Sequence, residues 1–204
     1  MPGHRLFAMV YDRMTAAMER RVLAARRARL LGGLTGVVLD VGAGTGVNLP
    51  HFASAARVLA TEPDPHMRQR LARRVNRARV PVEVLDSPAE ALALPDASVD
   101  AVVCTLVLCT VAHPDRALTE ARRVLAPGGR LVVLEHVRGS GGLARWQDRV
   151  DPLWRRLAAG CRPNRDTEAA VRRAGFVVEH RDAFAELPRF TPIRTMVELI
   201  ARPG

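Results

Sequence analysis

Lysine is absent from this 204-residue sequence, so all 31 of its basic residues are arginines. The formal net charge is +10, yet the arginines are spread along the chain and do not gather in one tract. Surfaces that bind nucleic acids combine clustered basic residues with aromatic side chains, and aromatic residues make up only 4% of this chain. We therefore expect no nucleic-acid partner. The alternative from another functional class is that this protein is a non-enzymatic nucleic-acid-binding module.

Cysteine is also scarce, since Cys104, Cys109 and Cys161 form no CxxC pair and leave an odd number. This spacing argues against a disulfide framework and a zinc site, so we expect a reducing, cytoplasmic compartment. We interpret Cys104 and Cys109 as core residues, because free cysteine is among the most buried residue types. No apolar run approaches the roughly 20 residues that span a bilayer, and arginines interrupt the apolar start of the chain. We expect at most weak peripheral contact with an anionic membrane.

Short β-rich runs alternate with helical stretches along most of the chain, which predicts βαβ units and a parallel sheet. We predict an α/β fold, a single Rossmann-like domain over residues 1–204 with a mostly parallel seven-stranded sheet and helices on both faces. Helices are expected to begin near Val47, Pro65, Pro88 and Pro114. Strands are expected over residues 37–41, 57–61, 82–85, 100–105, 130–135, 176–182 and 195–201.

Two further segments have helical periodicity. Leu6, Val10 and Met14 recur at helical spacing and start an amphipathic helix that runs to about Leu31, before two glycines. We predict that residues 1–33 form an N-terminal helical cap. A glycine-rich joint at 139–142 precedes a second helical stretch, so residues 139–165 are predicted to form an insert after the fifth strand.

The segment Val37–Gly46, with the sequence VVLDVGAGTG, carries the main functional signal. Its three glycines allow the positive φ angles of a tight turn and close approach of a ligand to the backbone. A dinucleotide-binding motif would place its third glycine where this chain has Val47. Asp40 would repel a pyrophosphate but suits the ammonium group of S-adenosyl-L-methionine, and Glu62 at the second strand end suits its ribose hydroxyls.

These features predict a site for S-adenosyl-L-methionine, with S-adenosyl-L-homocysteine as the product. Pro88 stands where many such enzymes have an Asp, so adenine contacts are expected from the residues around it, and Thr105 is expected to face the sulfonium. The alternative is that Asp40 and Glu62 only cap local helices. The predicted cofactor-binding residues are Asp40, Gly42, Ala43, Gly44, Thr45, Gly46, Asn48, Glu62, Pro63, Ser87, Ala89, Glu90 and Thr105.

The segments Val99–Cys109, Val124–Gly129 and Leu134–Val137 resemble the animal membrane-associated alkyl-thiol S-methyltransferases. The similarity extends from Val37 to about Phe176. It implies a class I methyltransferase of the methyltransferase type 11-like family that acts on small thiols. The animal proteins begin with an apolar membrane anchor, whereas this sequence starts with a helical stretch that contains arginines, so the resemblance does not extend to membrane attachment. The wider family includes phospholipid and quinone methyltransferases. A phospholipid or another small molecule acceptor, methylated at nitrogen, oxygen or carbon, is therefore the alternative.

Methyl transfer to a thiol is helped by a base or a positive charge, because the thiolate is the reactive form. His136, just past the fifth strand, is the candidate catalytic residue. Tyr11, Trp146 and Trp154 are the candidate acceptor-binding residues, which places the 139–165 insert on the acceptor side. The alternatives are a histidine that bonds a neighbouring loop and tryptophans that only pack. No carboxylate cluster follows the fourth and fifth strands, so no metal is expected.

Overall fold

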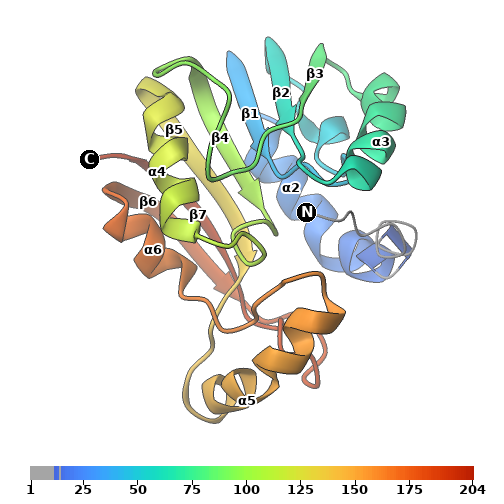
Figure 1. Cartoon of the computed structure of the whole chain (residues 1–204), viewed down its shortest axis with the longest axis vertical. Helices are drawn as coiled ribbons and strands as arrows, with labels where there is room; N and C mark the ends of the chain where they lie inside the picture. Colours follow the sequence, from blue (N-terminus) through green and yellow to red (C-terminus); the bar gives the residue numbers. More distant parts are fainter. Residues whose placement is uncertain (1–11, 14) are drawn as a thin grey trace.

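The computed structural model describes residues 12, 13 and 15–204 of the chain. Its centre is a seven-stranded sheet in the order β3-β2-β1-β4-β5-β7-β6 (Figure 1). Neighbours from β3 to β5 pair in parallel, whereas β7 runs antiparallel to both β5 and β6. The predicted sheet is confirmed. Its strands are β1 (Val37–Val41), β2 (Arg57–Thr61), β3 (Val82–Leu85), β4 (Val99–Thr105), β5 (Leu125–His136), β6 (Phe176–Phe184) and β7 (Met196–Pro203).

Helices cover both faces of this sheet (Figure 1). On one face, Leu118 and Val171 pack with Leu39 in a buried cluster. On the other, Leu31 packs with Val38, because successive strand residues point to opposite faces. The helices are a π-helix (Glu19–Leu23), α2 (Ala24–Leu31), two 3-10 helices (Leu49–His51 and Val75–Arg77), α3 (Pro65–Arg74), α4 (Pro114–Val124), α5 (Gly141–Leu157) and α6 (Thr167–Arg173).

The N-terminal helix is anchored to the far edge of the sheet. Arg26 on α2 forms ion pairs with Asp182 at 2.9 Å and with Glu198 at 2.6 Å, from β6 and β7. The helix ends at Leu31 with Gly32 as its C-cap, as the sequence predicts. Within the described part of the chain, no helix has the length and apolar character needed to cross a membrane.

The helix predicted to begin near Val47 is wrong. The chain forms turns there, followed by the 3-10 helix Leu49–His51. Pro50 has no N–H to donate to the Gly46 carbonyl, so a regular α-helical turn loses one of its bonds.

The helix predicted near Pro88 is also wrong, whereas those at Pro65 and Pro114 are confirmed. The Ser87 hydroxyl donates to the Ala91 carbonyl and accepts from the Ala93 N–H, both at 3.0 Å. These side-chain bonds hold the segment as a loop, because serine competes with the helical bonding pattern of its own backbone.

The strand order reverses between β1 and β4, since β1 continues to β2 and β3 on one side while β4 and β5 lie on the other. In open α/β sheets, ligands bind in the crevice at the carboxyl ends of the strands at such a switch point. Most of the residues selected from the sequence follow these strand ends.

Candidate active site

The glycine loop after β1 has the backbone that the sequence predicts. Gly42, Gly44 and Gly46 have φ angles of 61°, 59° and 84°. The Ala43 N–H donates to the Thr61 carbonyl at 2.8 Å, which ties the loop to the end of β2. A Cβ added at Gly42 would come within 2.3 Å of the Val107 side chain, so only glycine fits against the exit of β4.

Glu62 lies directly beside this loop and is only 7% exposed. One carboxylate oxygen accepts the Gly44 N–H at 2.9 Å, and the other accepts the Asp64 N–H at 2.8 Å. Burial raises the pKa of Glu62, and these two N–H groups oppose the shift. Each oxygen keeps a second lone pair, so the fixed carboxylate can still accept a hydrogen bond from each of two neighbouring hydroxyls.

Asp40 belongs to a fully buried polar network at the end of β1. Asn48 donates to Asp40 Oδ1 at 2.7 Å and to Thr105 Oγ1 at 2.9 Å. Asp40 Oδ2 is buried and has no hydrogen-bond partner among the described residues. Burial raises the pKa of Asp40 to about 7, although Asn48 and Arg27 oppose the shift. An orphan carboxylate oxygen at this position fits an ammonium group.

Arg27 on α2 completes this network, and the sequence reasoning missed it. Its guanidinium donates to Thr105 Oγ1 at 2.8 Å and to Asn48 Oδ1, and Glu19 accepts its Nε–H at 3.0 Å. The side chain is only 2% exposed. The sequence signal that could have identified Arg27 is its spacing from buried residues. Arg27 shares a helix face with the buried residues Leu23, Leu30 and Leu31.

The N-terminal helix also contacts the glycine loop directly. The Thr45 hydroxyl donates to Asp12 at 2.7 Å and accepts from Arg74 of α3 at 3.1 Å. Arg74 and Asp12 form an ion pair that closes this triangle. The cap, the loop and α3 are therefore joined beside the predicted cofactor site. Tyr11 lies outside the described residues.

Two side chains that follow β3, Ser87 and Glu90, form hydrogen bonds with backbone groups of loops. The Ser87 hydroxyl is used inside its own segment, and Glu90 accepts the N–H groups of Ala112 and His113 at 2.9 and 3.2 Å. Ala89 is 6% exposed and packs in the core. Pro63 follows Glu62 and is exposed. The adenine contacts of Ser87, Ala89 and Glu90 and the cofactor contact of Pro63 stay predictions.

The exit of β4 carries backbone strain. Leu106 has a φ of 55°, a conformation that non-glycine residues rarely adopt. Glu135 of β5, fully buried, accepts the N–H groups of Val107 and Leu108, each at 2.6 Å. Burial raises the pKa of Glu135 to about 7. Strain of this kind is held by surrounding structure and is common at functional sites.

His136 ends β5 and is 3% exposed. Its Nε2 lies 3.1 Å from Cys161 Sγ, and Trp154 Nε1 donates to the same sulfur at 3.3 Å. His136 Nδ1 has no hydrogen-bond partner among the described residues. The structure thus brings together two residues predicted to form the acceptor side, His136 and Trp154. Trp146 is half-buried on α5.

The donor atoms of Cys109, His136 and Cys161 all lie within 4.8 Å of one another. The imidazole and the indole both point at the Cys161 sulfur. Both contacts are hydrogen-bond contacts to the sulfur. The expectation that this protein uses no metal stays a prediction.

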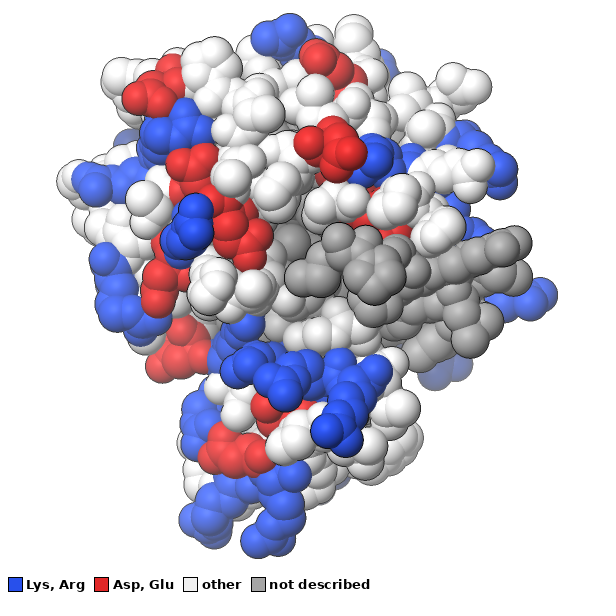
Figure 2. Space-filling model, in the orientation of Figure 1, with Lys and Arg blue, Asp and Glu red and all other residues white. Residues whose placement is uncertain are grey.

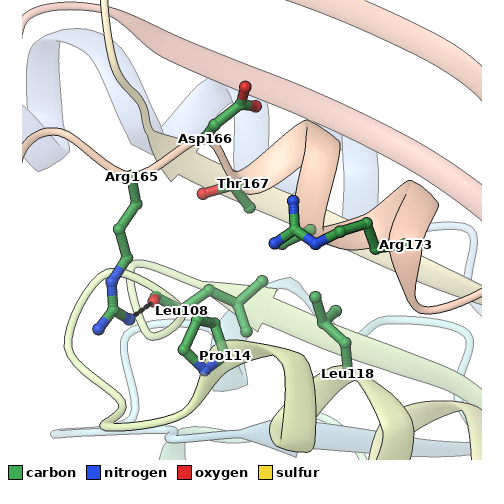
Figure 3. Close-up of a pocket in the computed structure, with 8 residues that line it drawn as sticks. Leu108, Pro114, Leu118, Arg165, Asp166, Thr167 and Arg173 are labelled. Carbon is green, nitrogen blue, oxygen red and sulfur yellow. Dashed lines mark hydrogen bonds between the residues drawn. The ribbon is translucent and has the colours of Figure 1, made fainter.

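A separate cavity of about 150 Å³ lies between α4 and α6 (Figure 3). Arg165 crosses one end and donates to the Leu108 carbonyl. The volume is below the roughly 300–1,000 Å³ of small-molecule sites. None of the predicted site residues lines it; its lining is Leu108, Pro114, Leu118, Arg165, Asp166, Thr167, Ala170 and Arg173.

Comparison with known proteins agrees with this geometry. Residues 39–133 match the family model of a methyltransferase domain. The chain is 38% identical to human thiol S-methyltransferase TMT1B over 154 residues, which are 71% of this chain and 63% of that protein. It therefore spans less than two thirds of that relative's length. It is 33% identical to human thiol S-methyltransferase TMT1A over 177 residues, 83% of this chain and 72% of that protein.

A solved structure has the same fold. The structure of a putative methyltransferase from Bacillus halodurans superposes with a TM-score of 0.72 over 88% of this chain and 98% of that one. Its sequence identity is 18%, so this likeness concerns the fold. Fold, glycine loop and relatives lead to one conclusion: the chain belongs to the S-adenosylmethionine-dependent methyltransferases, in the family that includes the thiol S-methyltransferases.

Proposed function

We propose that this protein transfers the methyl group of S-adenosyl-L-methionine to a small thiol. The observation that carries the cofactor assignment is the buried network in which Asn48 bridges the Arg27 guanidinium and Asp40, whose Oδ2 has no partner among the described residues. A negative and a positive group held side by side match the ammonium and carboxylate groups of an amino acid. Glu62, across the glycine loop, supplies the acceptor for the two ribose hydroxyls.

When bound, the cofactor supplies an activated methyl group on its sulfonium. The residues of this chain then have to align the acceptor and exclude water. Asp40 and Arg27 orient the amino-acid end and Glu62 orients the ribose. Thr105, at the end of β4, accepts hydrogen bonds from Arg27 and Asn48. The predicted cofactor-binding residues beyond this set belong to the same proposal.

His136 acts on the acceptor side in this proposal. Its Nε2 is engaged with Cys161, and its buried Nδ1 has no hydrogen-bond partner among the described residues. Burial is the largest influence on the pKa of His136 and would lower it, yet the charge and hydrogen bond of Cys161 and the charge of Glu135 together outweigh burial, so the pKa is raised. A charged imidazole favours the thiolate form of a nearby thiol. We therefore propose that His136 stabilises the acceptor thiolate, and that Trp146 and Trp154 shape an apolar pocket beside it.

The test is an assay for S-adenosyl-L-homocysteine release across panels of small apolar thiols, phenols, amines and phospholipids. We expect turnover with thiols. The matched control is Arg29→Ala, because Arg29 is an exposed neighbour of Arg27 on α2. Arg27→Ala should raise the KM for the cofactor, whereas Arg29→Ala should not.

Methylation of a phenol, an amine or a phospholipid without any thiol turnover would contradict the thiol assignment while leaving the cofactor assignment intact. Failure to bind S-adenosyl-L-methionine in calorimetry would contradict both.

A further inference from the structure

Three side chains from different segments converge on the sulfur of Cys161, which follows α5. His136 Nε2 lies 3.1 Å from this sulfur and Trp154 Nε1 lies 3.3 Å from it. Cys109 follows β4, and its sulfur lies within 4.8 Å of the Cys161 sulfur. A sulfur with this many donors around it is a strong acceptor, which favours its charged form.

The electrostatics of the cluster assign different states to the two cysteines. The interaction with the nearby Cys109 thiol and the charge of His136 lower the pKa of Cys161 well below its ordinary value, although burial opposes them. The same interaction, together with burial, raises the pKa of Cys109, so Cys109 stays a thiol. Glu135 and Arg165 also interact with Cys161, with opposite signs. The thiolate is the attacking form in thiol–disulfide exchange.

The backbone already holds the two cysteines side by side. The N–H of Arg162, next to Cys161, donates to the Cys109 carbonyl at 2.9 Å. Closing a disulfide requires the sulfurs to approach to about 2.05 Å, and they start within 4.8 Å. Cys161 is half-buried and Cys109 is 2% exposed. Cys161 is therefore the sulfur that a small reagent reaches first.

We propose that Cys161 and Cys109 form a redox pair that is reversibly oxidised by low-molecular-weight disulfides. The Cys161 thiolate attacks one sulfur of the small disulfide and expels the first thiolate, which leaves a mixed disulfide on Cys161. Cys109 then attacks the Cys161 sulfur and expels the second thiolate. The protons of His136 and Cys109 end on the two released thiols, so one small disulfide is reduced as two protein thiols are oxidised.

Oxidation has a structural consequence at the acceptor side. The disulfide joins the segment after α5 to the exit of β4 and removes the negative charge that faces His136 and Trp154. Oxidation of the redox pair depends on the contacts around Cys161 and does not require methyl-transfer activity.

The test is incubation of the full chain with glutathione disulfide near neutral pH, alkylation of free thiols and mapping of the peptides. We expect a Cys109–Cys161 disulfide that dithiothreitol reverses, while Cys104 stays a free thiol. Cys104 serves as the internal control, because it lies inside β4 and is also 2% exposed. The absence of the Cys109–Cys161 disulfide, or equal modification of Cys104, would overturn the proposal.

Two variants separate the steps. Cys109→Ala should stop at a mixed disulfide on Cys161 that retains the small thiol. His136→Gln should slow formation of the mixed disulfide about tenfold near neutral pH, with recovery at alkaline pH as the thiolate forms unaided. An unchanged rate in His136→Gln near neutral pH would remove the assigned role of His136 in holding the thiolate, and a cross-link through Cys104 in Cys109→Ala would overturn the pairing.

Discussion

At the scale of single residues, the site depends on acidic groups whose oxygens are fixed in place by neighbouring backbone and side-chain donors. Glu62 is held by two N–H groups from different segments, and Asp40 is held by Asn48. Fixed acceptors lose little conformational freedom when a ligand binds, so they favour affinity and orientation together.

Glu62→Ala should weaken binding of S-adenosyl-L-methionine by roughly 1–3 kcal/mol, the scale for losing hydrogen bonds to a charged group. Calorimetric titration measures the loss. The matched control is Glu83→Ala, because Glu83 is an exposed acidic residue on the neighbouring strand β3. Unchanged affinity in a folded Glu62→Ala protein would mean that the ribose hydroxyls are bound elsewhere.

At the scale of elements, α5 is the helix that departs most from the compact sheet (Figure 1). Leu153 and Leu157 lie one turn apart on it and are 61% and 68% exposed. Arg155 and Arg156 stand between them, and Figure 2 shows basic side chains gathered over this lobe. Exposed apolar residues beside arginines are typical of helices that touch an anionic membrane surface.

We expect the protein to bind vesicles containing phosphatidylglycerol weakly, with binding that falls as salt screens the arginines. Replacing Leu153 and Leu157 together by serine should reduce sedimentation with the vesicles. Val177→Ser is the control, because Val177 is 56% exposed on β6, away from α5. Equal loss in both proteins, or salt-independent binding, would show that α5 is not the contact.

At the scale of the whole molecule, two buried carboxyl groups contribute to the pH dependence of stability. Burial raises the pKa values of Asp40 and Glu135, each to about 7. The folded state therefore holds more protons than the unfolded state between about pH 4 and pH 7. Their contribution to stability falls as pH rises through this window and is constant above it.

The thermal unfolding midpoint checks this prediction. Each unit of raised pKa corresponds to about 1.4 kcal/mol, so Asp40→Asn and Glu135→Gln should each raise the midpoint at pH 8 relative to wild type and have little effect near pH 4. Glu83→Gln, at an exposed position, should leave the profile unchanged. A difference between Asp40→Asn and wild type that does not grow with pH would contradict the assignment.

The sequence alone determined the strands, the glycine loop and the paired acids Asp40 and Glu62. These features are local: a β-rich run, a turn that needs positive φ and an acid at the end of a strand are all visible in a short window. The same reasoning failed after Pro88, because the hydroxyl of Ser87 bonds backbone groups of its own segment and outcompetes the helix.

The tertiary structure decided which distant residues meet. Arg27 reaches Thr105 because α2 packs on the sheet face to which β1 and β4 contribute. A short window of sequence does not reveal that an arginine side chain points into the protein. Cys109, His136 and Cys161 come from three segments and look like unrelated residues along the chain. Their chemistry arises from proximity, because a thiol becomes a stabilised thiolate only when packing brings donors and positive charge to its sulfur.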